Sequence, residues 1–281
     1  MTTPSAEDVA REACAALSAD FVEPLGQGAF KSAFLARREG RSVALKLAPV
    51  TPASKARIAR ECEAQRDCNH LAIATLCEAF EFTHGSGSYW IWIEEHLGAG
   101  TLEKRRGSAI FSPAVVSSLG ATLVGALDHL RARNLVHRDI KPANIIFRSD
   151  AEPVLTDFGI VRALDLPTLT QHFLPHGPGT PAYAAPEQLN NEIQLIDWRT
   201  DQFGLAIVLG ECALGHHPFS PGKDVYQAVA RMAAHEALPA ESSDMLHRTG
   251  LGWLTKALSP WPVARYRTPN AMLAAIIGGA L

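Results

Sequence analysis

The stretch that decides the fold is His137-Arg138-Asp139-Ile140-Lys141-Pro142-Ala143-Asn144, which is followed by Asp157-Phe158-Gly159. Two short apolar runs, 145–147 and 154–156, lie between these segments and flank a polar turn. Such a pattern predicts a β-hairpin. The hairpin would bring Asn144 and Asp157, which stand at its two open ends, to the same place.

The polar side chains of this stretch suit the transfer of a phosphoryl group. That reaction needs divalent cations on the nucleotide phosphates, a carboxylate that orients the attacking hydroxyl, and positive charge against the transferred group. Asp139 can accept the hydrogen bond of the hydroxyl, and Lys141 can lie against the phosphate. Asn144 and Asp157 offer a neutral and a charged oxygen to Mg²⁺, which prefers oxygen ligands.

The octet and its downstream Asp-Phe-Gly resemble the catalytic loop and the magnesium loop of eukaryotic-type protein kinases. Lys141 resembles the lysine found at this position in the serine/threonine branch of the family. The chain is therefore similar to bacterial Hanks-type serine/threonine kinases, and we expect it to be a stand-alone catalytic domain. The resemblance implies an α+β, bilobal protein-kinase-like fold, in which a small antiparallel β-sheet lobe with one helix joins a larger, mainly helical lobe. We expect an N-terminal helical extension (1–20), a nucleotide-binding small lobe (21–97) and a large lobe for catalysis and substrate binding (98–281).

Upstream, residues 25–31, Leu-Gly-Gln-Gly-Ala-Phe-Lys, resemble the family's glycine-rich loop, whose backbone amides lie close over the phosphates. Gly26 and Gly28 are its expected nucleotide-binding residues. Lys31 stands where the family has a third glycine. Its charge would attract nucleotide, whereas its side chain would restrict closure of the loop, and both alternatives stay open.

Val43-Ala44-Leu45-Lys46 follows at the distance of one hairpin, and Lys46 resembles the strand lysine that holds the α- and β-phosphates. Residues 52–70 are predicted to form a helix. Within it, Glu61 aligns with the family's glutamate partner of that lysine, and Glu63 is the fallback. The resemblance therefore places Lys46 and Glu61 in the catalytic set. A solvated position on the helix is the ordinary alternative for either glutamate.

Residues 89–93 are predicted to form a strand that leads to the adenine hinge, Glu94-Glu95-His96-Leu97. The spacing of the downstream residues places Glu94 beside the back pocket, where the family has an apolar residue. A shift of one residue would place Ile93 there instead, and both registers stay open. The hinge residues expected to bind the nucleotide are Glu95 and Leu97.

Residues 179–187, Gly-Thr-Pro-Ala-Tyr-Ala-Ala-Pro-Glu, resemble the end of a kinase activation segment, whose threonine, here Thr180, lies in the substrate groove. Arg138 resembles the arginine that receives a phosphate carried by this segment. A phosphothreonine adds nearly two negative charges and pairs well with arginine, so we predict autophosphorylation at Thr168 or Thr170. An unmodified polar loop is the alternative.

Two further resemblances concern structure. Asp201 resembles the acid at the start of the central helix of the large lobe, which holds the catalytic loop by hydrogen bonds. Arg265 resembles the arginine that pairs with the glutamate of Ala-Pro-Glu, which is Glu187 here. We expect this pair to be buried and structural.

Helical segments frame these motifs. Residues 1–20 contain an amphipathic helix that Ser5 and Asp8 would begin as a capping box. Residues 113–133 show the helical apolar spacing of Val116, Leu119, Leu123, Leu127 and Leu130. Residues 271–281 are too few to span a bilayer, which needs about 20, and are predicted to form a last packed helix.

Composition sets the remaining limits. The 281 residues are 47% hydrophobic and carry a net charge of −3, which indicates neither a nucleic-acid nor a membrane partner. The five cysteines form no close sequence pair, and we expect reduced thiols and a cytoplasmic location. A zinc site is disfavoured because no Cys-x-x-Cys motif occurs; its candidate ligands would be Cys62, Cys68, His70 and Cys77.

The sequence thus predicts an ATP-dependent serine/threonine protein kinase that uses Mg²⁺, or Mn²⁺ in its place. Its partners would be protein substrates, with transient self-association for autophosphorylation. Lys31 and the unusual hinge keep open a pseudokinase that acts as a nucleotide-responsive scaffold. A small-molecule phosphotransferase of the aminoglycoside or choline kinase type is the other alternative, although those relatives lack the Ala-Pro-Glu segment.

Overall fold

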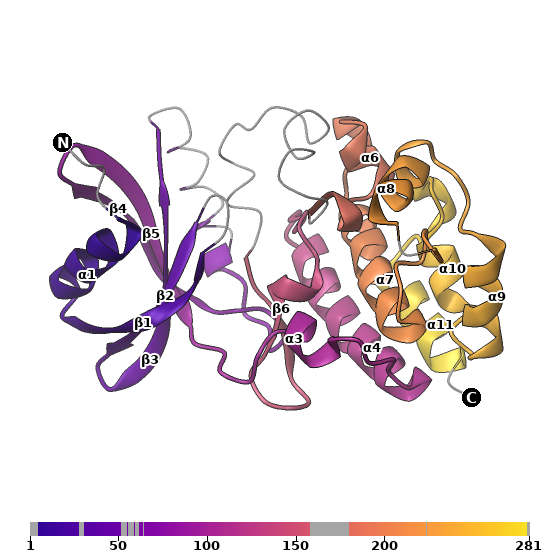
Figure 1. The fold of residues 1–281 in the computed structure, drawn as a ribbon, viewed down its shortest axis with the longest axis horizontal. Helices are drawn as coiled ribbons and strands as arrows, with labels where there is room; N and C mark the ends of the chain where they lie inside the picture. The colour runs from indigo at the N-terminus through magenta and orange to yellow at the C-terminus, as the bar shows by residue number, and fades with distance from the viewer. Residues whose placement is uncertain are drawn as a thin grey trace. The chain divides into compact units, whose positions relative to one another are not determined.

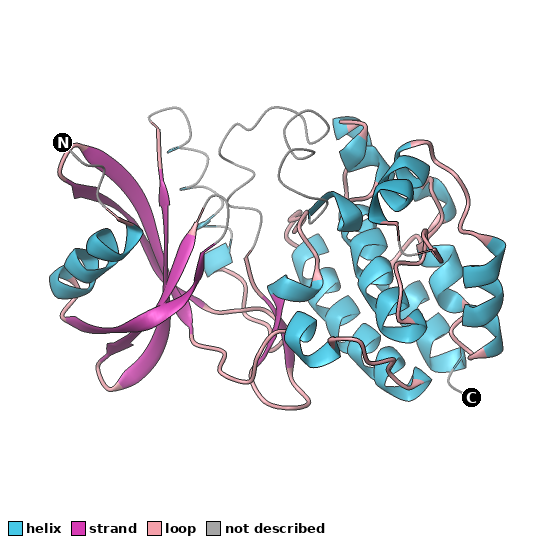
Figure 2. Ribbon diagram, viewed as in Figure 1, coloured by secondary structure: helices cyan, strands magenta, loops and turns pink. Residues whose placement is uncertain are grey.

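The computed structural model describes residues 5–27, 31–51, 55, 59, 62–63, 65–157, 180–222 and 224–279. These residues form two compact units (Figures 1 and 2). The first holds the described residues of Met1–Asn69 and Ile73–Gly98. The second holds His70–Ala72 and the described residues from Ala99 onward.

A five-stranded antiparallel sheet forms the framework of the first unit, in the order β1-β2-β3-β5-β4 (Figure 2). Its strands are β1 Ala19–Gln27, β2 Ser32–Arg38, β3 Arg41–Pro49, β4 Leu76–His84 and β5 Gly87–Glu95. Glu39 and Gly40 connect β2 to β3 with φ angles of 51° and 76°. Left-handed backbone at both positions is what a tight two-residue hairpin requires.

Helix α1, Ala6–Ala16, covers one face of this sheet (Figure 1). It begins as predicted, because Ser5 and Asp8 form a reciprocal capping box. Its buried side chains pack against an apolar patch on the strands. The helix contributes Val9, Ala10, Ala13 and Cys14, and the strands contribute Phe34, Ala36, Leu45, Leu47 and Ile91. Burial raises the pKa of the Cys14 thiol.

The opposite face of the sheet carries a different cluster, because side chains alternate along a strand. Trp90 and Trp92 of β5 pack there with Ala48 of β3 and with Cys62. Cys62 belongs to the predicted helix, of which residues 55, 59, 62–63 and 65–66 are described and helical. The Trp90 indole Nε1 donates to the Cys62 Sγ at 3.2 Å.

The second unit is mainly helical (Figure 2). Its helices are α3 Leu102–Arg106, α4 Pro113–Arg131, α6 Pro186–Leu189, α7 Trp198–Leu214, α8 Val225–Ala233, α9 Ala240–Arg248, α10 Trp253–Ala257 and α11 Pro269–Gly279. Short 3₁₀ turns are η1 Pro142–Asn144, η4 Thr180–Tyr183, η5 Ile193–Leu195 and η6 Pro262–Ala264. The predicted hairpin is confirmed, since β6 (Ile145–Phe147) pairs antiparallel with β7 (Pro153–Leu155).

Two helices form the centre of the second unit. Helix α4 buries every residue of its predicted apolar stripe and packs against α7 and α11. Within the described part of the chain, α4 alone is long and apolar enough to cross a membrane by length and composition, and these packing contacts account for its apolar character. Helix α7 is buried along almost its whole length. At Gly204 a Cβ would lie 3.2 Å from the Tyr183 carbonyl oxygen, so glycine permits a close approach.

Some predicted boundaries were wrong. Strand β5 continues through Glu95 and not only to residue 93, so Glu94 and Glu95 belong to the sheet. Both residues pair with neighbouring strands, and these ladder bonds extend the strand. The long helix ends at Arg131 and not at residue 133. The last helix begins at Pro269, where proline suits a first turn.

Candidate active site

The loop between α4 and η1 is held by a buried carboxylate of α7. Asp201 Oδ2 accepts from the His137 backbone N–H at 2.6 Å, and Oδ1 accepts from the Arg138 backbone N–H at 2.7 Å. Asp201 is only 3% exposed. Because charge-assisted hydrogen bonds to a buried carboxylate are strong, the two bonds fix the direction of the loop. The predicted role of Asp201 is confirmed.

His137 connects this loop to the residue before Asp157. Its Nδ1 accepts from the Asp139 backbone N–H at 3.3 Å, so the proton is on Nε2, which donates to the Thr156 carbonyl oxygen at 3.1 Å. Arg138 has a φ of 65°, a left-handed conformation that is unfavourable for a side chain of its size. Its carbonyl oxygen accepts from Gln188 Nε2 at 3.0 Å. The loop is therefore fixed in a strained shape by buried neighbours.

Three of the predicted site residues meet at one carboxylate oxygen. Asp139 Oδ2 accepts from Lys141 Nζ at 2.8 Å and from Asn144 Nδ2 at 2.8 Å. Asn144 Nδ2 also donates to the Asp139 carbonyl oxygen at 2.8 Å. The Asn144 amide nitrogen thus faces Asp139, which leaves its Oδ1 as the atom suited to a cation.

The β6–β7 hairpin brings the last predicted ligand beside Asn144. The Thr156 backbone N–H donates to the Asn144 carbonyl oxygen at 3.0 Å, and Asp157 follows directly. Asp157 has a φ of 64°, a second left-handed non-glycine residue at this place. Phe158 and Gly159 lie outside the described residues. Two hard oxygen donors, an amide and a carboxylate, are an appropriate set for Mg²⁺.

The first unit holds Lys46 in a buried ion pair with Glu94. Lys46 Nζ lies 2.5 Å from Glu94 Oε2, and the side chains are 7% and 2% exposed. Gln65 Nε2 donates to Glu94 Oε1 at 3.3 Å. The predicted partner Glu61 lies outside the described residues, so its pairing stays a prediction. Glu94 was not predicted as a partner; the register of β3 against β5 puts Lys46 and Glu94 on one face of the sheet.

The other predicted nucleotide-binding residues of the first unit lie along its strands and their ends. Gly26 is in β1 and exposed, whereas Gly28 lies outside the described residues. Lys31 is half-buried just before β2. Glu95 ends β5, and its Oε1 accepts from the Thr75 backbone N–H at 3.0 Å. Leu97 is half-buried just after β5. Glu63, the fallback partner of Lys46, is exposed in the helical segment.

The end of the predicted activation segment is anchored to α7 and to the loop after it. The Tyr183 hydroxyl donates to Glu211 Oε2 at 2.9 Å, and Arg106 Nη2 lies 3.7 Å from the same oxygen. Burial, and then the Glu211 charge, raise the pKa of Tyr183, and burial raises the pKa of Glu211. The His217 Nε2 donates to the Ala182 carbonyl oxygen at 2.8 Å. This tautomer follows from Nδ1, which accepts from the Phe219 backbone N–H.

Among the predicted regulatory residues, Thr168 and Thr170 lie outside the described residues. Thr180 begins η4, and the structure does not describe its side chain. Arg138 is half-buried next to Asp139. The phosphate-receiving role of Arg138 therefore stays a prediction.

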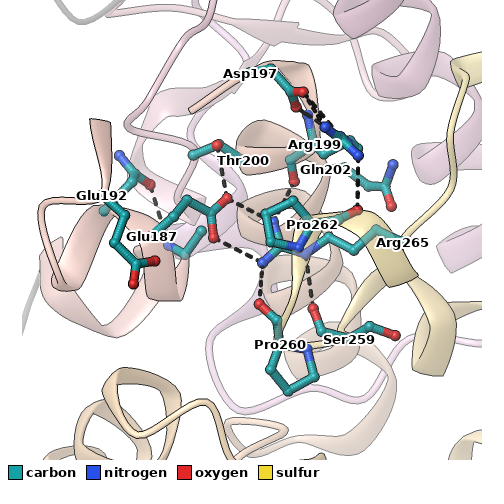
Figure 3. A network of polar contacts seen from close by, with 12 residues as sticks. Glu187, Glu192, Asp197, Arg199, Thr200, Gln202, Ser259, Pro260, Pro262 and Arg265 are labelled. Atoms are coloured by element: carbon teal, nitrogen blue, oxygen red, sulfur yellow. Dashed lines mark hydrogen bonds and ion pairs between the residues drawn. The ribbon is translucent and has the colours of Figure 1, made fainter. Parts of the chain in front are cut away.

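Glu187 and Arg265 form the expected buried ion pair (Figure 3). Arg265 Nη1 and Nη2 donate to the two Glu187 oxygens at 2.8 and 2.9 Å, and both side chains are 0% exposed. The remaining Arg265 donors reach backbone oxygens of Arg199, Ser259 and Pro260. All five guanidinium N–H groups are thereby satisfied. This one side chain thereby joins α6, the start of α7 and the loop that follows α10.

The disfavoured zinc site finds no support in the geometry. In the described ranges, no group of three or more His, Cys, Asp and Glu side chains is arranged to hold a metal ion. All five cysteines are free thiols, and Cys14, Cys62, Cys68 and Cys212 are buried. Burial raises the pKa of Cys212 to about 12, so this thiol stays protonated.

Comparison with known proteins gives one consistent result. A model of the protein kinase domain matches residues 20–271. Serine/threonine-protein kinase PknJ of Mycobacterium tuberculosis is 29% identical over 272 residues, which are 91% of this chain and 45% of that protein. Serine/threonine-protein kinase PknF of the same species is 32% identical over 264 residues, 88% of this chain and 53% of that protein. The chain thus spans about half the length of these relatives.

Breaking the Glu187–Arg265 pair is expected to destabilise the second unit strongly. Glu187→Met leaves a fully buried guanidinium without its carboxylate, which costs about 3 to 5 kcal/mol in the free energy of unfolding. The double variant Glu187→Met/Arg265→Met should recover part of this loss. Urea denaturation measures the free energy of unfolding of the wild type, the single variant and the double variant. The control is Asp197→Asn in the more exposed Arg199 pair, which should cost less than about 1 kcal/mol. An equal loss of stability in Glu187→Met and Asp197→Asn would contradict the structural role of the buried pair.

His217 is expected to make the protein less stable in acid. Burial lowers its pKa from the ordinary 6.5 to about 4. Below pH 6.5 the unfolded chain therefore binds the proton more readily than the folded one, and stability is lost as pH falls toward 4. The loss is roughly 3 kcal/mol at pH 4. Denaturation at several pH values should show that the free energy of unfolding depends less on pH in His217→Gln than in the wild type. In the exposed variant His247→Gln this pH dependence should be that of the wild type. An unchanged dependence in His217→Gln would disprove this origin.

Proposed function

The chain belongs to the protein kinase family, whose domain model matches residues 20–271, and we propose that it is an ATP-dependent serine/threonine protein kinase. It transfers the γ-phosphate of ATP to serine or threonine hydroxyls of proteins. The observation that carries the proposal is the Asp139 carboxylate, whose Oδ2 accepts from both Lys141 and Asn144 at 2.8 Å on a loop fixed by Asp201. A carboxylate with this fixed orientation can direct a hydroxyl.

The second-unit residues take the following roles. Asp139 accepts the hydrogen bond of the substrate hydroxyl and takes its proton as the oxygen attacks the γ-phosphorus, while the bond from that phosphorus to the β–γ bridging oxygen breaks and ADP leaves. The Lys141 ammonium, 2.8 Å from Asp139 Oδ2, stabilises the charge of the transferring phosphoryl group. Asn144 Oδ1 and the Asp157 carboxylate would hold Mg²⁺ or Mn²⁺. Such a cation, when bound, neutralises charge on the phosphate oxygens.

The first-unit residues bind the nucleotide. Lys46 binds the α- and β-phosphates, and Glu61 supports it from the helix. The glycine-rich loop binds the phosphates through its backbone amides, with Gly26 and Gly28 as its contact positions. Glu95 and Leu97 contact the adenine.

Protein partners follow from the same proposal. Substrates present serine or threonine acceptors, and two copies of the chain associate transiently when one phosphorylates the other. We assign no nucleic-acid or membrane partner. We also propose a cytoplasmic location, which the five free thiols support.

The variant Asp139→Asn is expected to lose about a hundredfold or more in kcat, because the amide cannot take up the hydroxyl proton. Transfer of labelled phosphate from ATP to a generic protein substrate measures this loss. The control is Asp244→Asn, the same chemical change at an exposed site in α9. If the wild-type chain labels no protein, the scaffold alternative replaces the kinase. If label appears only on small metabolites, the chain is a small-molecule phosphotransferase.

Autophosphorylation is expected at Thr168 or Thr170, with Arg138 as the group that receives the phosphate. Mass spectrometry after incubation with ATP and Mg²⁺ should find the phosphate there in the wild type and not in Asp139→Asn. The double variant Thr168→Ala/Thr170→Ala should lose activity. Both threonines unmodified in a fully active protein would reject the proposal.

A further inference from the structure

We propose that Glu94 is a positioning residue for Lys46, holding the ammonium from the central part of the sheet so that it is directed for phosphate binding. This inference rests on the proposed role of Lys46 in nucleotide binding. It assigns a function to a carboxylate at a position where the predicted hinge led us to expect an apolar side chain.

The strand register explains why these two residues meet. In the β3–β5 ladder, Lys46 pairs with Trp92, and Ala44 pairs with Glu94. Lys46 and Glu94 are therefore diagonal neighbours on one face of an antiparallel pair, a distance that long side chains span. Ile93 pairs with Leu45, so its side chain lies on the other face of the sheet from Lys46.

Burial makes the pair mutually dependent. The Lys46 and Glu94 side chains are 7% and 2% exposed, with 2.5 Å between Nζ and Oε2. A buried ammonium or carboxylate is costly without an opposite charge. Glu94 therefore supplies a counter-charge to Lys46 that solvent cannot replace.

The backbone of Glu94 is fixed independently of the helical segment. Strand β5 lies between β3 and β4, and Glu94 pairs with Ala44 on one side and with Leu76 on the other. A carboxylate on a strand paired on both sides has little freedom to move. Its second oxygen accepts from Gln65 Nε2 at 3.3 Å, which ties the helical segment to the same carboxylate. The sheet thus sets the position of the carboxylate that holds Lys46.

An ammonium carries three N–H donors, so it can hold a carboxylate and phosphate oxygens together. Fixing one N–H toward Glu94 restricts the directions of the others and lowers the entropy lost when phosphate binds. Loss of Glu94 should therefore weaken nucleotide binding. This weaker binding of nucleotide should occur only when Lys46 is present.

Calorimetric titration of the full chain with a non-hydrolysable ATP analogue and Mg²⁺ tests this. The proteins are the wild type, Glu94→Gln, Lys46→Met and the double variant. We expect Glu94→Gln to raise Kd about tenfold, and the double variant to bind no more weakly than Lys46→Met alone. In steady-state kinetics Glu94→Gln should raise the KM for ATP more than it lowers kcat, and Glu94→Asp should restore part of the binding.

The matched control is Glu78→Gln, which removes a 2.5 Å pair with Arg38 in the same sheet where both side chains are about a third exposed; its Kd should not change. Thermal melting verifies folding. If Glu94→Gln does not fold, Glu94→Met, which carries the apolar type expected there, must show the same weakened binding.

Four outcomes would overturn the inference. An unchanged Kd in both Glu94 variants removes the positioning role, and a lower Kd shows that Glu94 competes with phosphate for Lys46. An equal penalty in the Lys46→Met background shows that Glu94 acts through the fold. If the wild type itself does not bind the analogue, the proposed function fails together with this inference, whereas the first three results leave that function intact.

Discussion

The geometry of the candidate site depends first on one buried carboxylate accepting two successive backbone N–H groups. Asp201 stands in the first turn of α7 and holds the backbone of His137 and Arg138 at 2.6 and 2.7 Å. Arg138 is left-handed, and such a conformation persists only where the surroundings determine it. Asp139 follows Arg138 directly, so the fixed backbone of Arg138 determines the direction of the Asp139 side chain.

Three buried acids share a common design. Glu94, Glu187 and Asp201 each join segments distant in the chain, and each has donors for both carboxylate oxygens. Apolar packing alone tolerates small shifts between elements, whereas a desolvated carboxylate must keep its donors within hydrogen-bond distance. The acids therefore set the relative positions of their elements within each unit.

Local motifs made much of this architecture predictable. The spacing of the octet and of Asp157 predicted the β6–β7 hairpin, and the Ser5 capping box and the apolar stripe of α4 predicted two helices. The Lys46–Glu94 pair was missed because a partner fixed by strand register needs the ladder, not the spacing in the chain. The end of β5 was missed for the same reason: hydrogen bonds to β3 and β4, and not local propensity, carry the strand through Glu95.

Helix α1 bears on how the first unit must be prepared. The family model begins at residue 20, so the whole of Ala6–Ala16 precedes it. A truncation at that boundary would expose Phe34, Leu45, Leu47 and Ile91, which α1 now covers. Bare apolar sheet faces promote aggregation. A fragment trimmed to the family boundary would therefore be poorly soluble for a reason unrelated to catalysis, and a usable fragment must start at or before Ser5.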